Sequence, residues 1–128
     1  MTANIATGTH LSFHVFWKWL KEHPNCLLRA GTADAALYDH DMVHWYLFED
    51  EDRNPVVQLI LGKTLMGEMV LDVQDVLYVQ VTVERHEDDP PVHLFEAMAG
   101  SASEAVPAYQ FVLVHGMEGQ GRHGVVAN

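Results

Sequence analysis

Residues 11–22 read LSFHVFWKWLKE, a stretch in which aromatic rings recur at the spacing of a helix. At about 100° per residue the largest apolar side chains form one stripe, and the charged side chains gather on the opposite arc. The stripe consists of Phe13, Phe16, Trp17 and Leu20. Thr9 or Ser12 is suited to cap the N-terminus, and Pro24 disfavours helical backbone at the residue before it. The pattern predicts an amphipathic helix over residues 11–22.

The apolar arc of this helix is wider than packing on a single sheet requires, because Leu11, Val15 and Trp19 lie beside the main stripe. We therefore expect a second cover over that flank: a second layer, a long loop or another subunit. The simpler alternative is that the aromatic side chains at the edge of the arc are half exposed, which is common in soluble proteins.

After the helix the apolar side chains recur every second residue, the spacing of a strand with one packed face. The predicted shared faces are Val57, Leu59 and Leu61; Leu65, Met69 and Leu71; and Leu77, Val79, Val81 and Val83. Further strands are predicted within residues 26–31, 35–39, 42–50, 92–99 and 109–116. Turn-forming residues fill positions 51–55, 62–64 and 72–75, and GSASEAVP (100–107) is interpreted as a linker.

Strands that are joined this closely in sequence usually pair as an antiparallel meander. The sequence therefore predicts an α+β fold, a single globular domain over residues 1–128. In it the N-terminal amphipathic helix packs on a mainly antiparallel meander sheet of about five to seven strands. No strand and crossover helix alternate along the chain, so a doubly wound parallel sheet is not expected. With 128 residues, 48% of them hydrophobic, the chain is long enough for one core.

The charge balance disfavours several classes of partner. The chain has 18 acidic and 7 basic residues, a formal net charge of -11. Nucleic acid and anionic membrane surfaces are both bound through cations, so neither is expected as a partner. The single cysteine, Cys26, excludes an intrachain disulfide and a cysteine-rich zinc site. The N-terminus lacks the features of a signal peptide, and no apolar run reaches about 18 residues, so a cytoplasmic location is expected.

The stretch LYDHDMVHWYLFEDED (37–52) contains several residue types that bind metals. Asp39, His40, Asp41 and His44 are the candidate ligands. Along a strand the two histidines lie about 13 Å apart, too far for one ion, so a metal site requires a turn at residues 39–41. The favoured interpretation is a turn followed by a half-buried strand, and no metal or other cofactor is predicted.

Other groupings are weaker candidates. His10 and His14 have helical spacing but lack the glutamate of an HExxH motif, and His86 and His93 bracket an acidic loop with two prolines. The carboxylates of Glu68, Asp72 and Glu84 are predicted on the polar face of the sheet. Gly119, Gly121 and Gly124 match a dinucleotide-binding pattern, but too few residues follow for the helix that this site needs.

With no catalytic motif present, the sequence favours a noncatalytic binding or protein-interaction module that acts as a homodimer and has a protein partner. The residues proposed for a ligand site or interface are Phe13, Trp17, Trp19, His44 and Trp45. The alternative is a small metal-assisted or acid-base enzyme that uses the histidines and aspartates near residues 39–44. Protonating all nine histidines would change the formal charge from -11 to -2, so we also expect self-association to increase near pH 5.5.

Overall fold

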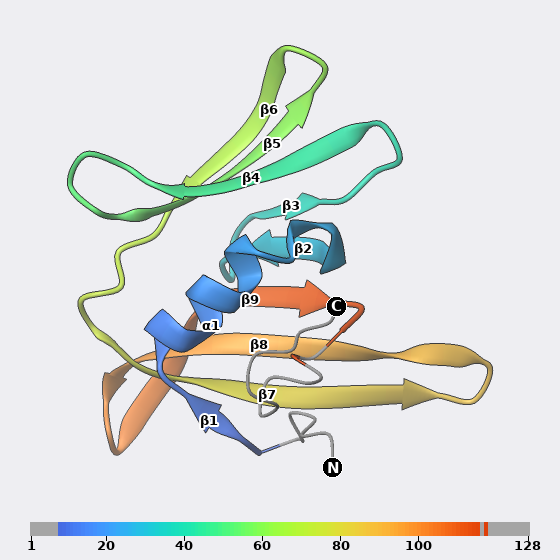
Figure 1. The fold of residues 1–128 in the computed structure, drawn as a ribbon. Coiled ribbons are helices and arrows are strands. Elements are labelled where there is room, and N and C mark those ends of the chain that lie inside the picture. The colour runs from blue at the N-terminus through green and yellow to red at the C-terminus, as the bar shows by residue number, and fades with distance from the viewer. Residues whose placement is uncertain (1–7, 116, 118–128) are drawn as a thin grey trace.

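The computed structural model describes residues 8–115 and residue 117. Within them, nine β-strands form two antiparallel sheets, and one α-helix packs against both (Figure 1). The large sheet has the strand order β1-β7-β8-β9-β2-β3, and the small sheet has the order β4-β5-β6. The large sheet contains β1 (His10–Leu11), β2 (Leu27–Gly31), β3 (Ala36–Tyr38), β7 (Val76–His86), β8 (Asp89–Ser101) and β9 (Glu104–Leu113). The small sheet contains β4 (Val43–Glu49), β5 (Pro55–Leu61) and β6 (Thr64–Val70).

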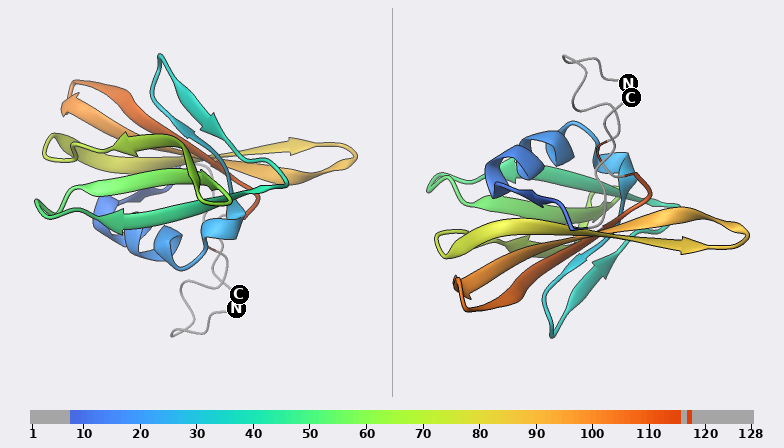
Figure 2. Two further views of the ribbon diagram at one scale, coloured as in Figure 1. Left: turned by 90° about the horizontal axis from the view of Figure 1, so that it is seen from above. Right: turned by 90° about the horizontal axis from the view of Figure 1, so that it is seen from below.

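Helix α1 (Phe13–Lys21) lies within the predicted segment. Its N-terminus is capped by Ser12, whose side-chain oxygen accepts a hydrogen bond from the Val15 N–H at 3.1 Å. At its other end Pro24 begins a short 3-10 turn, η1 (Pro24–Cys26), which leads into β2. The helix lies along one face of the large sheet, and the small sheet borders it (Figures 1 and 2).

One apolar core fills the space between the helix and the inner faces of both sheets. The ring of Phe16 stacks on Phe95 of β8, with 4.8 Å between centroids, and lies 5.2 Å from the ring of Phe111 of β9. Val57, Leu59, Val79 and Val81, predicted to face the core, are between 0% and 7% exposed. The predicted packing of an amphipathic helix on alternating strands is therefore confirmed for these positions.

The predicted α+β class and antiparallel pairing are confirmed, but the described strands form two sheets, so the prediction of one meander sheet of about five to seven strands is wrong. After β6 the chain passes through residues 71–75 into the other sheet, so β4–β5–β6 form a separate layer. This layer folds over α1 and the β2–β3 end of the large sheet (Figure 2). The chain also begins the large sheet before the helix, because His10–Leu11 pair with β7. The helix is accordingly preceded by a strand.

Three predicted inward positions are exposed: Leu61, at the end of β5, is 39% exposed, and β-bulges change the face that Leu65 and Leu77 occupy. In β7 the register shifts between Val76 and Tyr78, so Val76 packs against the core and Leu77 is 47% exposed. In β6 the shift opposite Leu59 and Ile60 leaves Leu65 50% exposed. The interpretation of residues 100–107 as a linker is also wrong, because β8 runs to Ser101 and β9 begins at Glu104.

Candidate interaction surface

The aromatic side chains of the apolar arc of α1 are largely buried within the chain itself, whereas Val15 beside them is 42% exposed. Trp17 and Trp19 are each 5% exposed, and Trp45 of β4 is 7% exposed. Phe13 is half-buried and stacks on Trp17, with 5.9 Å between ring centroids. Of the five residues proposed for a ligand site or interface, only His44 faces solvent. The arc therefore offers little aromatic surface to another subunit.

One carboxylate joins the helix to the small sheet. Glu49 Oε2, at the end of β4, accepts a hydrogen bond from Trp17 Nε1 at 2.7 Å and lies 2.8 Å from Lys21 Nζ. The hydrogen bond from Lys21, followed by that from Trp17, holds the pKa of Glu49 below its usual range, while burial acts in the opposite direction. Both donors come from α1, so this carboxylate fixes the position of the helix against β4.

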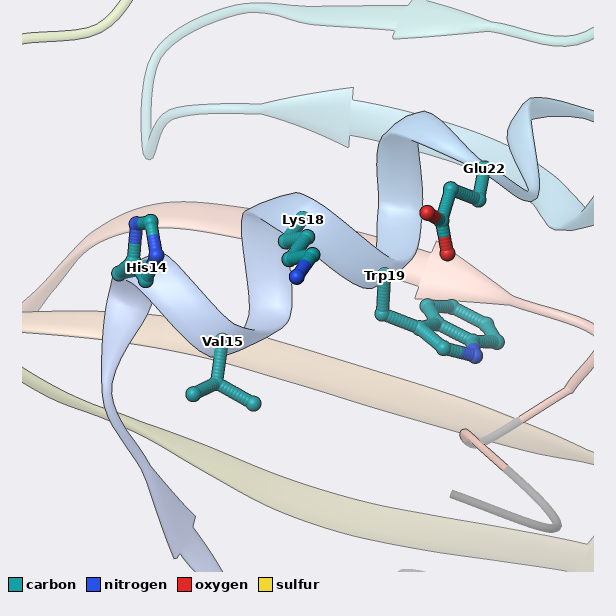
Figure 3. Close-up of a pocket in the computed structure, with 5 residues that line it drawn as sticks. All are labelled: His14, Val15, Lys18, Trp19 and Glu22. Carbon is teal, nitrogen blue, oxygen red and sulfur yellow. The ribbon is translucent and has the colours of Figure 1, made fainter. Parts of the chain in front are cut away.

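The outer side of α1 carries a shallow hollow of about 250 Å³ (Figure 3). Its lining residues all come from the helix or its C-terminal cap: His14, Val15, Lys18, Trp19 and Glu22. Trp19 also stacks on His23 at 4.4 Å between centroids, and its carbonyl oxygen lies 2.8 Å from His23 Nδ1. Because one helix face alone forms the hollow, no second element supplies converging groups to enclose a ligand.

The proposed metal ligands lie in an exposed turn and the start of β4. The Val43 N–H donates to the carbonyl oxygen of His40 at 3.1 Å, and the Met42 N–H donates to His40 Nδ1 at 3.3 Å. Asp39, His40, Asp41 and His44 are all exposed. In the part of the chain that the structure describes, no three histidine, cysteine, aspartate or glutamate side chains are placed to hold one ion. The His40 ring thus has a structural partner within its own turn.

The histidine pairs are not brought together. His10 lies in β1, before the helix, and stacks on Tyr78 at 4.2 Å between centroids, whereas His14 lines the hollow on α1. In the β7–β8 hairpin the backbone of His86 pairs with Asp89, whereas the buried His93 pairs with Val83, further along the ladder.

The three proposed carboxylates are also separate. Glu68 belongs to the small sheet, Asp72 to the connection between the sheets and Glu84 to the large sheet. The Asp72 N–H donates to the hydroxyl of Tyr109 at 2.8 Å, which anchors this connection to β9. Gly119, Gly121 and Gly124 lie outside the described residues.

The most distinctive surface of the molecule is the face of the small sheet that points away from the core, which we call the outer face. Cross-strand pairing arranges it in three rows, each running across β4, β5 and β6. The rows are Phe48, Val56 and Val70; Tyr46, Gln58 and Glu68; and His44, Ile60 and Leu65. Two rows consisting mainly of apolar side chains therefore flank a polar one.

The side chains of the outer face are exposed on the edge strands β4 and β6, whereas Val56 of the central strand is 2% exposed. Tyr46 is 56% exposed, Phe48 38%, Leu65 50% and Val70 51%. In the middle row Gln58 Nε2 donates to Glu68 Oε2 at 2.6 Å. The turn between β4 and β5, next to the row of Phe48, contains the acidic residues 50–52. The surface is thus apolar at its margins and negative at its centre and at one end.

The corresponding face of the large sheet has a different character. There Glu96 accepts hydrogen bonds at 3.0 Å from both Gln80 Nε2 and Gln110 Nε2, so a polar ladder crosses three strands. Such a ladder satisfies its own polar groups. The two sheets thus differ in what their solvent-facing sides offer to another molecule.

The sequence interpretation missed Tyr46, Phe48 and Val70 as surface residues of interest, whereas it named Glu68 among the candidate carboxylates of the polar sheet face. A signal was present, because HWYLFE in β4 is apolar on both sides of the strand, which one buried face does not require.

Comparison of the chain with protein-family models, curated proteins and solved structures found no match. Among the described residues, no helix has the length and apolar character needed to cross a membrane.

Proposed function

We propose that this chain is a noncatalytic protein-interaction module that binds its partner through the outer face of the small sheet. The supporting observation is the distribution of exposed apolar side chains. Among the described residues, eleven large hydrophobic side chains are exposed, and six of them belong to β4–β6. Four of these, Tyr46, Phe48, Leu65 and Val70, belong to the rows of the outer face; the other two are Leu61, which alternates with the inward Val57 and Leu59, and Met66 at the register shift of β6. Gathering of apolar side chains on one surface is typical of protein-binding sites.

The arrangement of the two layers explains how this surface is held in place. The inner face of the small sheet packs Trp45, Val57 and Leu59 into the core, and Glu49 ties its first strand to α1. A sheet anchored in this way keeps its outer side chains in fixed positions, which lowers the entropy lost on binding.

Two other predictions for this chain, an enzyme that uses residues 39–44 and a homodimer, have less support from the geometry. Asp39, His40 and Asp41 lie in an exposed turn and His44 lies in β4, so among the described residues these side chains do not converge as the metal-assisted or acid-base enzyme requires. A homodimer remains a prediction, and sedimentation velocity at micromolar concentration tests it. Since Trp17 and Trp19 of the helix arc are each only 5% exposed, we expect any dimer to form through another surface.

Site-specific photo-crosslinking tests the proposed function. A photoreactive phenylalanine analogue would replace Tyr46 on the outer face or, as the matched control, Tyr38, a 62% exposed tyrosine of β3 in the large sheet. After irradiation in extracts of the source cells, we expect discrete protein adducts from position 46 and few from position 38. Equal adducts from both positions, or none from position 46, would contradict the proposal.

A further inference from the structure

We infer that the partner of the outer face is an extended cationic segment, with a lysine or arginine between two apolar residues, which pairs alongside β6. This inference rests on the proposed function and specifies its partner. The three rows of the outer face carry the argument. Along β6 they present Val70, Glu68 and Leu65, an apolar, an acidic and an apolar side chain in succession.

The centre of the outer face requires a positive charge. The Glu68 carboxylate is exposed and is hydrogen bonded only to the Gln58 amide among the contacts of the described residues. An apolar partner would bury this charge without a counterion, which is costly. A lysine or arginine opposite Glu68 would instead form an ion pair while its apolar neighbours cover Val70 and Leu65.

The surroundings of the face reinforce this preference. Residues 50–52 are acidic and exposed or half-buried, and they adjoin the row of Phe48. Glu49 at the end of β4 is already paired with Lys21, and Asp50 accepts hydrogen bonds within the turn, so the side chains of Glu51 and Asp52 remain to attract a cation. The positive side chains in the small sheet and its turns are Arg53 and Lys63, each in a hairpin turn at an opposite end of β5. Opposite charges on a partner would steer it to this face.

A second copy of the chain fits this surface poorly. Two copies packed face to face about the centre of the outer face would bring their Glu68 carboxylates toward each other. Each copy also carries a formal net charge of -11, so long-range repulsion opposes the encounter. A cationic segment from another protein avoids both penalties.

The strand order indicates where an extended partner would lie. β6 ends the small sheet, and no other strand among the described residues pairs with its free side. The opposite edge strand, β4, is bordered by α1 and by η1. The register shift in β6 precedes Gly67, so Gly67–Val70 form the regular part of this edge. An added strand would hydrogen bond there and place alternate side chains on the outer face.

A peptide titration tests the inference. The probe is the end-capped peptide Thr-Val-Thr-Lys-Thr-Val-Thr, and the matched control has glutamate in place of its lysine. Binding to ¹⁵N-labelled protein is followed by NMR. We expect the lysine peptide to shift the amide signals of residues 67–70 and to bind at least about tenfold more tightly than the glutamate peptide.

Substitution of Glu68 supplies a second measurement. In Glu68→Gln, whose amide preserves the shape of the side chain, we expect the preference for the lysine peptide to fall by at least about threefold. Glu84→Gln, an exposed glutamate of β7, is the control and should leave the preference unchanged. Equal binding of the two peptides, no binding of either, or shifts confined to the large sheet would overturn the inference.

The crosslinking test of the proposed function and the peptide titration can fail independently of each other. Adducts from position 46 without any preference for the lysine peptide would leave the interaction module standing and remove the cationic partner. Sedimentation velocity would reveal a second copy as the occupant if a dimer formed at neutral pH and dissociated on Val70→Asp. That result would also overturn the inference while supporting the outer face as a binding surface.

Discussion

Replacing Glu49 tests the link that holds α1 against the small sheet. In Glu49→Ala the indole N–H of Trp17, a residue 5% exposed, would lose its acceptor. Leaving a buried donor without a partner costs about 1–3 kcal/mol. The ion pair with Lys21 adds less, about 0–1 kcal/mol, because both side chains are a third or more exposed and solvent screens them. We expect Glu49→Ala to lower the free energy of unfolding by about 2 kcal/mol.

Two further variants separate the hydrogen bond from the charge. Glu49→Gln keeps an oxygen that can accept from Trp17, so it should cost about 1 kcal/mol or less. Lys21→Gln removes the ion pair alone and should cost least. Urea denaturation measures all three, with the exposed Glu51→Gln in the same turn as the control. Equal stability of Glu49→Ala and the unsubstituted protein would refute the reasoning.

The stabilisation by Glu49 should also depend on pH. Because folding lowers the pKa of this carboxyl, the folded state binds its proton less tightly than the unfolded state. The contribution is therefore fully present above the unfolded pKa, near 4.5, and is lost as the pH falls through the lower folded value. The stability difference between the unsubstituted protein and Glu49→Gln should be constant from pH 7 to about pH 5.5 and should shrink below about pH 4.5. A difference that stays the same down to pH 3 would contradict the assignment.

Three other predictions follow from the packing and the charge. Trp45→Phe should change stability by only about 1 kcal/mol, because the buried Trp45 Nε1 has no hydrogen-bond partner among the described residues. Trp17→Phe, which loses the bond to Glu49, should cost about 1–2 kcal/mol more in the same urea titration. Gly31→Ala should cost about 3 kcal/mol, because its Cβ would meet the backbone of Ala35 and Ala36; intact stability would show that this turn relaxes. Light scattering at low salt should increase between pH 7.5 and about pH 5.5 as histidines gain protons, and a flat profile would count against that expectation.

The sequence predicted the elements of this fold better than their arrangement. Period-3.6 and period-2 patterns depend on local burial, so α1 and the strand segments around Val57 and Val79 could be located from residue spacing alone. The division into two sheets depends on which strands pair across long separations. The alternation of apolar residues in β5 is the same whether its neighbours form one sheet or two, so it carries no information on this point.

The misassigned positions have a shared cause. Leu65 and Leu77 follow the apolar alternation, but a bulge near each changes the side of the strand to which they point. The shift in β6 places Leu65, which sequence reasoning assigned to the core, on the outer face. The role of Glu49 was missed for another reason, since it depends on a contact with Trp17, 32 residues earlier in the chain.

Thiol labelling is the most direct measure of whether the small sheet closes the core with one face and leaves the other free to bind. Val70→Cys and Met69→Cys would each be made in a Cys26→Ala background and shown by circular dichroism to be folded. These neighbouring residues lie on opposite faces: Val70 is 51% exposed, and Met69 packs against the core. Their reaction with a thiol reagent reports the accessibility of each face.

We expect the cysteine at position 70 to react at least about tenfold faster than that at position 69, and the lysine peptide to slow the reaction at position 70. Equal rates at the two positions in the free protein would contradict the assignment of the two faces. A peptide that binds yet leaves the rate at position 70 unchanged would contradict the outer face as the binding surface.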